Sequence, residues 1–142
     1  MKVFAVIGYH NSGKTTLIEN LIPQLLRRGY RVGYIKHDPK GHGITDKEGS
    51  DTYRISKYLK KLALLSPNRL TYWEKENKGI LDIIGKFFSD CDVVILEGFK
   101  DEKRIPKIAV GEVKGENILL RVDSNTKIED IIKSIENLED LI

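Results

Sequence analysis

The sequence contains a single cysteine, Cys91, among its 142 residues. One cysteine excludes an intrachain disulfide and a metal cluster held by several thiolates of the same chain. This usage is typical of a reducing compartment, so we expect the cytoplasm. The fold must then be stabilised by apolar burial, for which this length and a hydrophobic content of 40% are sufficient.

Long hydrophobic runs and a strong excess of one charge are also absent. No segment approaches the roughly 18 apolar residues of a membrane-spanning helix, and the run Val3–Ile7 is too short for a signal segment. The formal net charge of +3 is too small to indicate a nucleic-acid surface. We therefore expect one domain covering residues 1–142, with neither membrane nor nucleic acid as a partner.

Short β-branched runs alternate along the chain with segments of helical period. This alternation predicts an α/β fold, a mostly parallel sheet flanked by helices. Pro23 is expected to kink or end the first helix, and Thr126 with Glu129 has the spacing of a capping box. We expect strands at residues 3–7, 31–36, 92–96, 107–110 and 118–122, and helices at 15–28, 50–58, 80–88 and 126–138.

Residues 61–74 have the pattern of an antiparallel hairpin. Two apolar runs, 61–65 and 69–73, flank the turn sequence Ser66-Pro67-Asn68. Their apolar side chains either pack into a core, the interpretation we favour, or cover a subunit interface.

Residues Gly8 to Thr15 read GYHNSGKT and match the phosphate-loop pattern G-x-x-x-x-G-K-[ST]. Glycines let backbone amides wrap around phosphate oxygens, the lysine reaches the β- and γ-phosphates, and the threonine hydroxyl ligates Mg²⁺. The alternative is a glycine-rich turn with an exposed lysine. The motif and its surroundings predict triphosphate binding by Gly8, His10, Asn11, Ser12, Gly13, Lys14, Thr15 and Thr16.

Glu97 follows the apolar strand 92–96 and precedes Gly98. In phosphate-loop proteins such a strand delivers an acid to the magnesium site. Glu97 either completes a metal site with Thr15, directly or through water, or orients a hydrolytic water. A solvent-facing strand-end acid is the alternative. We assign Glu97 and Lys14 the catalytic roles.

Lys36 and His37 end the second expected strand and should face the same crevice. The three histidines, His10, His37 and His42, lack helical ligand spacing, so phosphate or substrate contacts are favoured over zinc.

The segment from Asp46 to Arg54 follows this crevice in the sequence. Asp46 is a candidate holder of a magnesium-bound water. Asp51, rather than Thr52, is the favoured helix cap. Arg54 pairs either with phosphate or with a nearby acid.

In combination these segments indicate one particular protein family. The sequence resembles the molybdopterin-guanine dinucleotide biosynthesis protein B (MobB) family in GYHNSGKTTL, RGYRVGYIKHD, the D-x-x-G-x-D-[ST]-x-R element at 46–54, LEGFK and PKIAV. The resemblance covers most of the chain. It implies a P-loop NTPase-like fold, GTP with Mg²⁺ and a homodimer. It also implies slow GTP hydrolysis and assistance to a molybdenum cofactor guanylyltransferase that attaches GMP to molybdopterin.

Two departures accompany the resemblance. Residues 38–45 read DPKGHGIT, where the family has a histidine-rich stretch, and no Asn-Lys-x-Asp guanine motif occurs in the sequence. Asp123 is the candidate acid for guanine at a late strand end.

Two alternative functions compete with this one. A small-molecule kinase usually closes an arginine-rich lid, but residues 38–49 contain no arginine. The other alternative function is that of a nucleotide-sensing adapter that needs no hydrolysis.

Overall fold

The computed structural model describes residues 1–43, 46–75 and 78–142 and separates the chain into two compact units. The first unit comprises Met1–His37 and Leu81–Ile142, and the second comprises Asp38–Ile80. The expected strands of the parallel sheet lie in the first unit, and the expected hairpin lies in the second. The single domain expected over residues 1–142 stays a prediction.

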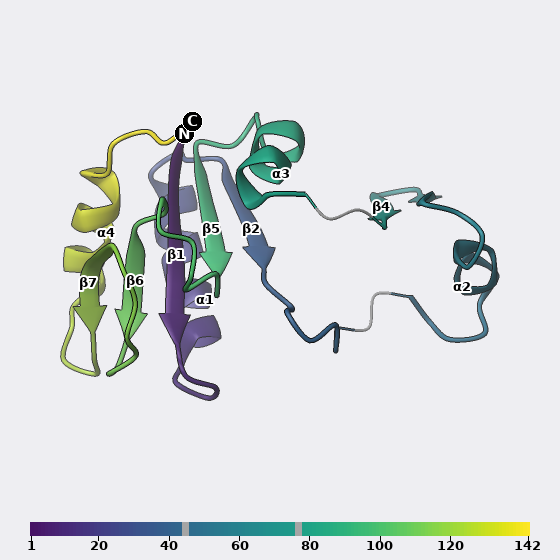
Figure 1. The fold of residues 1–142 in the computed structure, drawn as a ribbon. Coiled ribbons are helices and arrows are strands. Elements are labelled where there is room, and N and C mark those ends of the chain that lie inside the picture. Colours follow the sequence, from purple (N-terminus) through teal and green to yellow (C-terminus); the bar gives the residue numbers. More distant parts are fainter. Residues whose placement is uncertain (44–45, 76–77) are drawn as a thin grey trace. The chain divides into compact units, whose positions relative to one another are not determined.

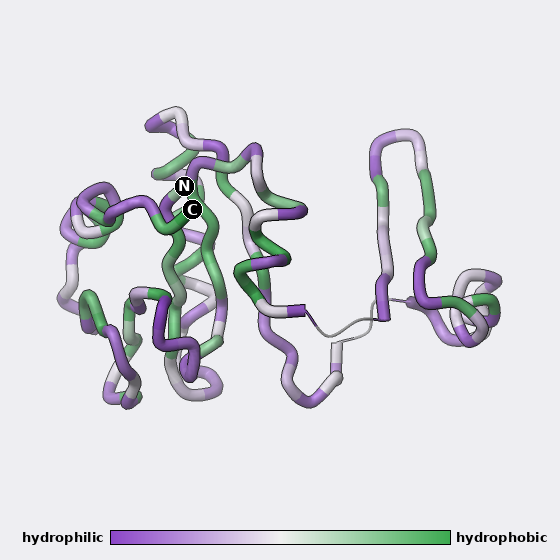
Figure 2. The backbone as a smooth tube through the Cα atoms, turned by 45° about the horizontal axis from the view of Figure 1, so that its top comes forward, coloured by the Kyte–Doolittle hydropathy of each residue, from purple (hydrophilic) through white to green (hydrophobic). Residues whose placement is uncertain are grey.

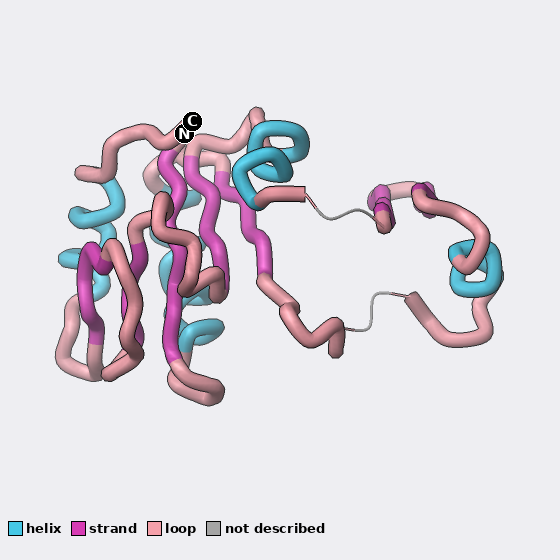
Figure 3. The backbone as a smooth tube through the Cα atoms, viewed as in Figure 1, coloured by secondary structure: helices cyan, strands magenta, loops and turns pink. Residues whose placement is uncertain are grey.

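The first unit is built on a five-stranded parallel sheet (Figure 1; Figure 3). The strand order is β2-β5-β1-β6-β7, and each neighbouring pair runs parallel. The predicted α/β fold with a mostly parallel sheet is confirmed. The strands are β1 (Lys2–Gly8), β2 (Val32–Lys36), β5 (Val93–Glu97), β6 (Lys107–Val110) and β7 (Ile118–Val122).

Both faces of this sheet are covered. Helices α1 (Lys14–Arg27) and α4 (Ile128–Glu136) contribute to a core cluster with Phe4, Val6 and Ile95 on one face. Figure 2 shows the matching hydrophobic colour along the central strands. On the other face, a Cβ at Gly33 would lie 2.5 Å from the Phe88 ring, just after α3 (Ile80–Phe87). The apolar runs are therefore buried on both sides.

The helix ends can be compared with two of our expectations. Helix α1 continues through Pro23 to Arg27, so Pro23 does not end it, and the alternative of a kink stays a prediction. Gly29 follows in a left-handed conformation, with φ of 86°. The predicted capping box was wrong, because Lys127 is the N-cap of α4 and makes no side-chain cap bond. Thr126 Oγ1 instead accepts from the Asp123 amide at 3.0 Å. Among the described residues, no helix combines the length and apolar character needed to cross a bilayer.

The second unit consists of a short helix and a hairpin. Helix α2 (Asp51–Ser56) precedes strands β3 (Lys61–Ser66) and β4 (Arg69–Glu74), which pair antiparallel as predicted. No residue of these three elements is buried. The favoured interpretation, core packing of the hairpin, was therefore wrong for the described part of this unit.

Candidate functional site

The loop between β1 and α1 reverses the chain in a tight turn. Asn11 and Gly13 have left-handed backbone angles, with φ of 60° and 98°, and the Ser12 amide donates to the Tyr9 carbonyl at 3.1 Å. A Cβ at Gly8 would lie 2.4 Å from Ser12 Oγ and 3.2 Å from the Val110 carbonyl oxygen, so glycine makes room where the loop closes on itself. The motif residues thus produce a compact backbone cradle after β1.

The first turn of α1 is suited to an anion. Gly13 is the N-cap and supplies no side-chain bond, and the first turn contains no acidic residue. The first amides of a helix have no intrahelical acceptor, and the helix dipole is positive there. Among the described residues, Ser12 Oγ is buried without a hydrogen-bond partner. A phosphate oxygen bound here would satisfy donors that are otherwise costly to bury.

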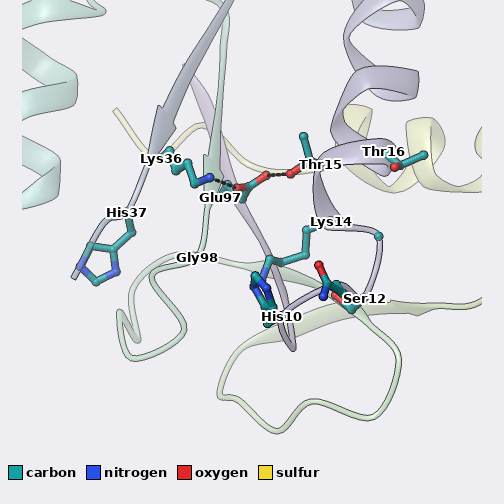
Figure 4. A pocket seen from close by; sticks show the side chains of 11 residues that line it. His10, Ser12, Lys14, Thr15, Thr16, Lys36, His37, Glu97 and Gly98 are labelled. Atoms are coloured by element: carbon teal, nitrogen blue, oxygen red, sulfur yellow. Dashed lines mark hydrogen bonds and ion pairs between the residues drawn. The ribbon is translucent and has the colours of Figure 1, made fainter. Parts of the chain in front are cut away.

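Lys14 lies folded over this loop. Its Nζ donates to the Gly8 carbonyl at 2.7 Å, and Figure 4 shows its side chain beside His10 and Ser12. A hydrogen bond from the ammonium to an anionic oxygen is stronger than one to a neutral carbonyl. A bound phosphate would therefore compete with the Gly8 carbonyl for the Lys14 ammonium.

Thr15 and Glu97 meet at the carboxyl end of the sheet. Thr15 Oγ1 donates to Glu97 Oε1 at 2.8 Å, across 82 positions of sequence (Figure 4). Glu97 ends β5 and is only 4% exposed. Hydroxyl and carboxylate oxygens are the hard ligands that Mg²⁺ takes in nucleotide sites. These two side chains fit the metal that the phosphate-loop motif implies.

Lys36 supplies the counter-charge to Glu97. Its Nζ lies 3.6 Å from Glu97 Oε2, and the two residues pair in the β2–β5 register. Burial, followed by the negative charge of Glu97, raises the pKa of neighbouring Tyr34 above its ordinary value of 10.0. A cation and an acid therefore face each other at the end of adjacent strands, where a divalent ion and phosphates would share them.

His37 contacts residues at the end of β5 and just after it. Its ring stacks on Phe99 with centroids 4.5 Å apart and planes at 19°, and its amide donates to the Glu97 carbonyl at 3.0 Å. Gly98 has φ of 92°, and a Cβ there would lie 3.2 Å from His37 Cβ. The predicted phosphate or substrate contact of His37 stays a prediction. Phe99 is a contact residue that we did not predict, and its signal in the sequence is its place in LEGFK.

One cavity brings these residues together. Its volume is about 490 Å³. The residues predicted to bind phosphate or metal all line this cavity except Gly8 and Asp46. Gly98, which was not among them, also lines it. The lining consists of His10, Asn11, Ser12, Gly13, Lys14, Thr15, Thr16, Lys36, His37, Glu97 and Gly98.

Comparison with known proteins identifies the family of the chain. A family model described as "Molybdopterin guanine dinucleotide synthesis protein B" (MobB) matches residues 3–134. This chain belongs to the MobB family. A crystal structure of molybdopterin-guanine biosynthesis protein B superposes with a TM-score of 0.72 at 25% identity, covering 94% of this chain and 97% of that one. The structure of Bacillus subtilis MobB gives 0.70 at 21% identity.

Curated relatives are longer than this chain. A "Putative molybdopterin-guanine dinucleotide biosynthesis adapter protein" of Methanocaldococcus jannaschii is 34% identical over 148 residues, which cover 95% of this chain. The adapter protein of Haemophilus influenzae is 38% identical over 110 residues, or 75% of this chain. The match covers 61% of the length of each of these relatives.

The other MobB-like segment, from Asp46 to Arg54, lies in the second unit. The Asp46 carboxylate accepts from the Thr52 hydroxyl at 2.8 Å and from the Ser50 hydroxyl at 3.3 Å. Its proposed link to a magnesium-bound water stays a prediction.

Helix α2 is capped by a residue that we had not favoured. Ser50 is the N-cap, and its Oγ accepts from the Tyr53 amide at 3.2 Å. The preference for Asp51 was wrong, because Asp51 already belongs to the helix and pairs with Arg54. Arg54 was expected to pair with phosphate or with a nearby acid, and this ion pair agrees with the acid.

The histidines do not gather into a metal site within the described ranges. No group of three or more His, Cys, Asp or Glu side chains there has a metal-binding arrangement. His10 and His37 line the nucleotide-site cavity, whereas the His42 amide donates to Asp38 Oδ1 at 3.0 Å. The atypical segment 38–45 is described up to residue 43, and Ile44 and Thr45 lie outside the described residues.

Proposed function

We propose that this chain is a cytoplasmic GTP-binding adapter in molybdopterin-guanine dinucleotide biosynthesis. It assists a separate guanylyltransferase in attaching GMP to molybdopterin. Membership of the MobB family and the printed names of the relatives support the pathway. The observation that carries the nucleotide-binding part is the Thr15–Glu97 hydrogen bond beside the uncapped start of α1.

Each site residue then has a defined task. The amides of the first turn of α1 and the Ser12 hydroxyl hold phosphate oxygens, and Lys14 balances the β- and γ-phosphate charge. Thr15 and Glu97 would hold Mg²⁺, which supplies further charge neutralisation when bound. Lys36 keeps the buried Glu97 carboxylate paired. Together these contacts are suited to tight binding of the nucleotide.

The proposal includes slow hydrolysis. A general base needs a carboxylate that reaches a water and accepts its proton. Both Glu97 oxygens already have partners, since Oε1 accepts from Thr15 and Oε2 lies beside the Lys36 ammonium. In this proposal Glu97 serves the metal together with Thr15, its hydrogen-bond partner, rather than activating water.

The proposal also includes a homodimer, with the second copy seated on one face of the hairpin. In the β3–β4 register, Leu65 lies opposite Leu70 and Ala63 lies opposite Tyr72, so the four side chains share a face. Leu65 is 81% exposed and Leu70 66%. An apolar strip of this kind on an edge-forming hairpin is suited to a symmetric contact with its own copy.

Calorimetry with GTP and ATP, each with Mg²⁺, tests the nucleotide part. We expect the affinity for GTP to be much higher than the affinity for ATP. Lys14→Ala should weaken GTP binding roughly 100-fold, because charge-assisted bonds to phosphate are lost. Lys114→Ala, which removes an exposed lysine of the same unit, is the matched control. Equal affinities for the two nucleotides would contradict the proposal.

Guanylylation of molybdopterin by the partner enzyme tests the pathway part. We expect wild-type protein with GTP to raise the yield of the dinucleotide cofactor, and Lys14→Ala to remove that gain. A gain that survives in Lys14→Ala, although GTP no longer binds, would show a scaffold that needs no nucleotide.

A further inference from the structure

A second cavity adjoins the phosphate loop in the first unit. Its volume is about 610 Å³. It shares Ser12, Gly13 and Thr16 with the cavity that is lined by Lys14 and Glu97, so the two cavities adjoin the same start of α1. A nucleoside triphosphate is an extended molecule. With its phosphates and metal at Thr15 and Glu97, its base needs a further space beside the same loop.

The walls of this second cavity suit a flat heterocycle. Leu17 of α1, Val110 at the end of β6 and Val122 at the end of β7 supply apolar surface, and Ile131 of α4 adds to it. Beyond Val110, Gly111 has φ of 76° and leaves open space where a Cβ would project. Binding sites for heterocycles combine such apolar walls with a few fixed polar groups. The first cavity is instead lined by polar, charged and glycine residues.

The fixed polar group here is Asp123. It directly follows β7 and lines the cavity. Asp123 Oδ1 accepts from the Asn125 amide at 2.8 Å and from the Thr126 hydroxyl at 3.3 Å, and the Asp123 amide donates to Thr126 Oγ1 at 3.0 Å. The turn therefore fixes the carboxylate orientation. An exposed acid without these bonds would be free to rotate away.

A carboxylate accepts hydrogen bonds and cannot donate them at neutral pH. Guanine presents two adjacent donors on one edge, the ring N1–H and the 2-amino group. Adenine presents an unprotonated N1 at the corresponding position, which would face the carboxylate as a second acceptor. A site built around such a bond discriminates strongly against a base that lacks the donor. The carboxylate at this cavity therefore matches guanine and opposes adenine.

We propose that this second cavity is the base subsite and that Asp123 recognises the N1–H and 2-amino groups of guanine. The inference rests on the proposed nucleotide function and specifies its base recognition. It gives a route to guanine selectivity in a sequence without an Asn-Lys-x-Asp motif. Asn20 of α1 also lines the cavity and provides a second polar group at its wall.

Asp123→Asn tests the inference with little risk to the fold. The asparagine carbonyl still accepts the turn bonds from Asn125 and Thr126, while its amide donates where the carboxylate accepted. We expect GTP affinity to fall roughly 100-fold and xanthosine triphosphate, with a carbonyl at the 2-position, to bind better than GTP. Calorimetry with GTP, inosine, xanthosine and adenosine triphosphates measures the full pattern.

Inosine triphosphate isolates the 2-amino group, which it lacks. Wild-type protein should prefer GTP to inosine triphosphate about tenfold or more, and Asp123→Asn should lose that preference. Asp130→Asn, which removes an exposed carboxylate from the first turn of α4, is the matched control and should keep the wild-type pattern. Circular dichroism verifies that each variant is folded.

The outcomes separate the two proposals. If Asp123→Asn keeps wild-type GTP affinity and base preference while Lys14→Ala abolishes binding, the base subsite is wrong and the phosphate site stands. If wild-type protein binds none of the four nucleotides, both proposals fail. Exchange of preference from GTP to xanthosine triphosphate supports the subsite directly.

Discussion

The two units of the chain treat their apolar residues in opposite ways. In the first unit, Val3 to Ile7 of β1 and Val93 to Leu96 of β5 are at most 1% exposed. In the second unit, no residue of α2, β3 or β4 is buried, and Leu65 is 81% exposed. An isolated two-stranded hairpin is marginally stable in water. The first unit therefore contains its own core, whereas the hairpin leaves its apolar side chains exposed.

The largest expected effect separates the units by stability. Phe4→Ala should lower the free energy of unfolding by about 3–5 kcal/mol, because Phe4 is fully buried between β1 and the α1–α4 layer. Tyr58→Ala, in the second unit, should change it by no more than about 0.5 kcal/mol, since Tyr58 is 86% exposed. Urea unfolding measures both. Equal losses would mean that Tyr58 is covered in solution, and the contrast between the units would fail.

A smaller effect is expected at the site carried by the first unit. Glu97→Gln should weaken magnesium-dependent GTP binding roughly 10- to 100-fold, because the carboxylate partner of Thr15 is lost. Without magnesium the two proteins should bind GTP similarly. Glu112→Gln alters an exposed acid of the same unit and provides the control. An equal loss with and without the metal would point to a role for Glu97 outside metal binding.

The hairpin is expected to change assembly rather than nucleotide binding. Leu65→Lys with Leu70→Lys places two charges on the apolar face, so the dimer should dissociate to monomers in light scattering. GTP affinity should be unchanged, because the proposed site residues that line the nucleotide cavity belong to the first unit. Asn68→Lys in the exposed turn is the control. A dimer that survives the double substitution would place the subunit contact elsewhere.

The smallest effect concerns acid sensitivity of the first unit. Hydrogen bonds from the Arg31 side chain hold the pKa of Asp92 at about 2, below its ordinary value of 3.8. A lowered folded-state pKa gives stability that is present above the unfolded value and is lost as pH falls toward the folded one. Asp92→Asn should therefore flatten the loss of stability between about pH 4 and pH 2. Urea midpoints across this range measure it, and an unaltered slope would argue against the pair.

Much of the fold and of the phosphate site could be predicted from the sequence, because the responsible signals are local. Apolar β-branched runs predicted the strands, and Ser66-Pro67-Asn68 predicted the hairpin turn. The spacing of Gly8, Gly13 and Lys14 predicted a strand–loop–helix cradle. The helix caps could not be predicted as well, since the hydroxyls of Ser50 and Thr126 each bond to nearby side chains as well as to one backbone amide.

Long-range placement was decided by the tertiary structure alone. Lys107 shows this most clearly, because a lysine in a strand is expected at the surface. Here it is 0% exposed, its Nζ donates to the carbonyls of Glu102 and Ile105 at 2.5 and 2.8 Å, and burial lowers its pKa. The partners are loop carbonyls, which carry no sequence signature. Only the folded chain reveals that the Lys107 ammonium is hydrogen-bonded to the loop before β6.

The sequence by itself determined the chemistry that this protein carries: a glycine-lined loop, its lysine and threonine, and an acid after an apolar strand. Only the tertiary structure determined that Thr15 Oγ1 and Glu97 Oε1, 82 positions apart, lie 2.8 Å from each other, and that Asp123 lines a cavity beside the same loop. The physical reason is that local periodicity predicts strands and helices, whereas strand order depends on the packing of the whole sheet. The order β2-β5-β1-β6-β7 brings these distant strand ends to one edge.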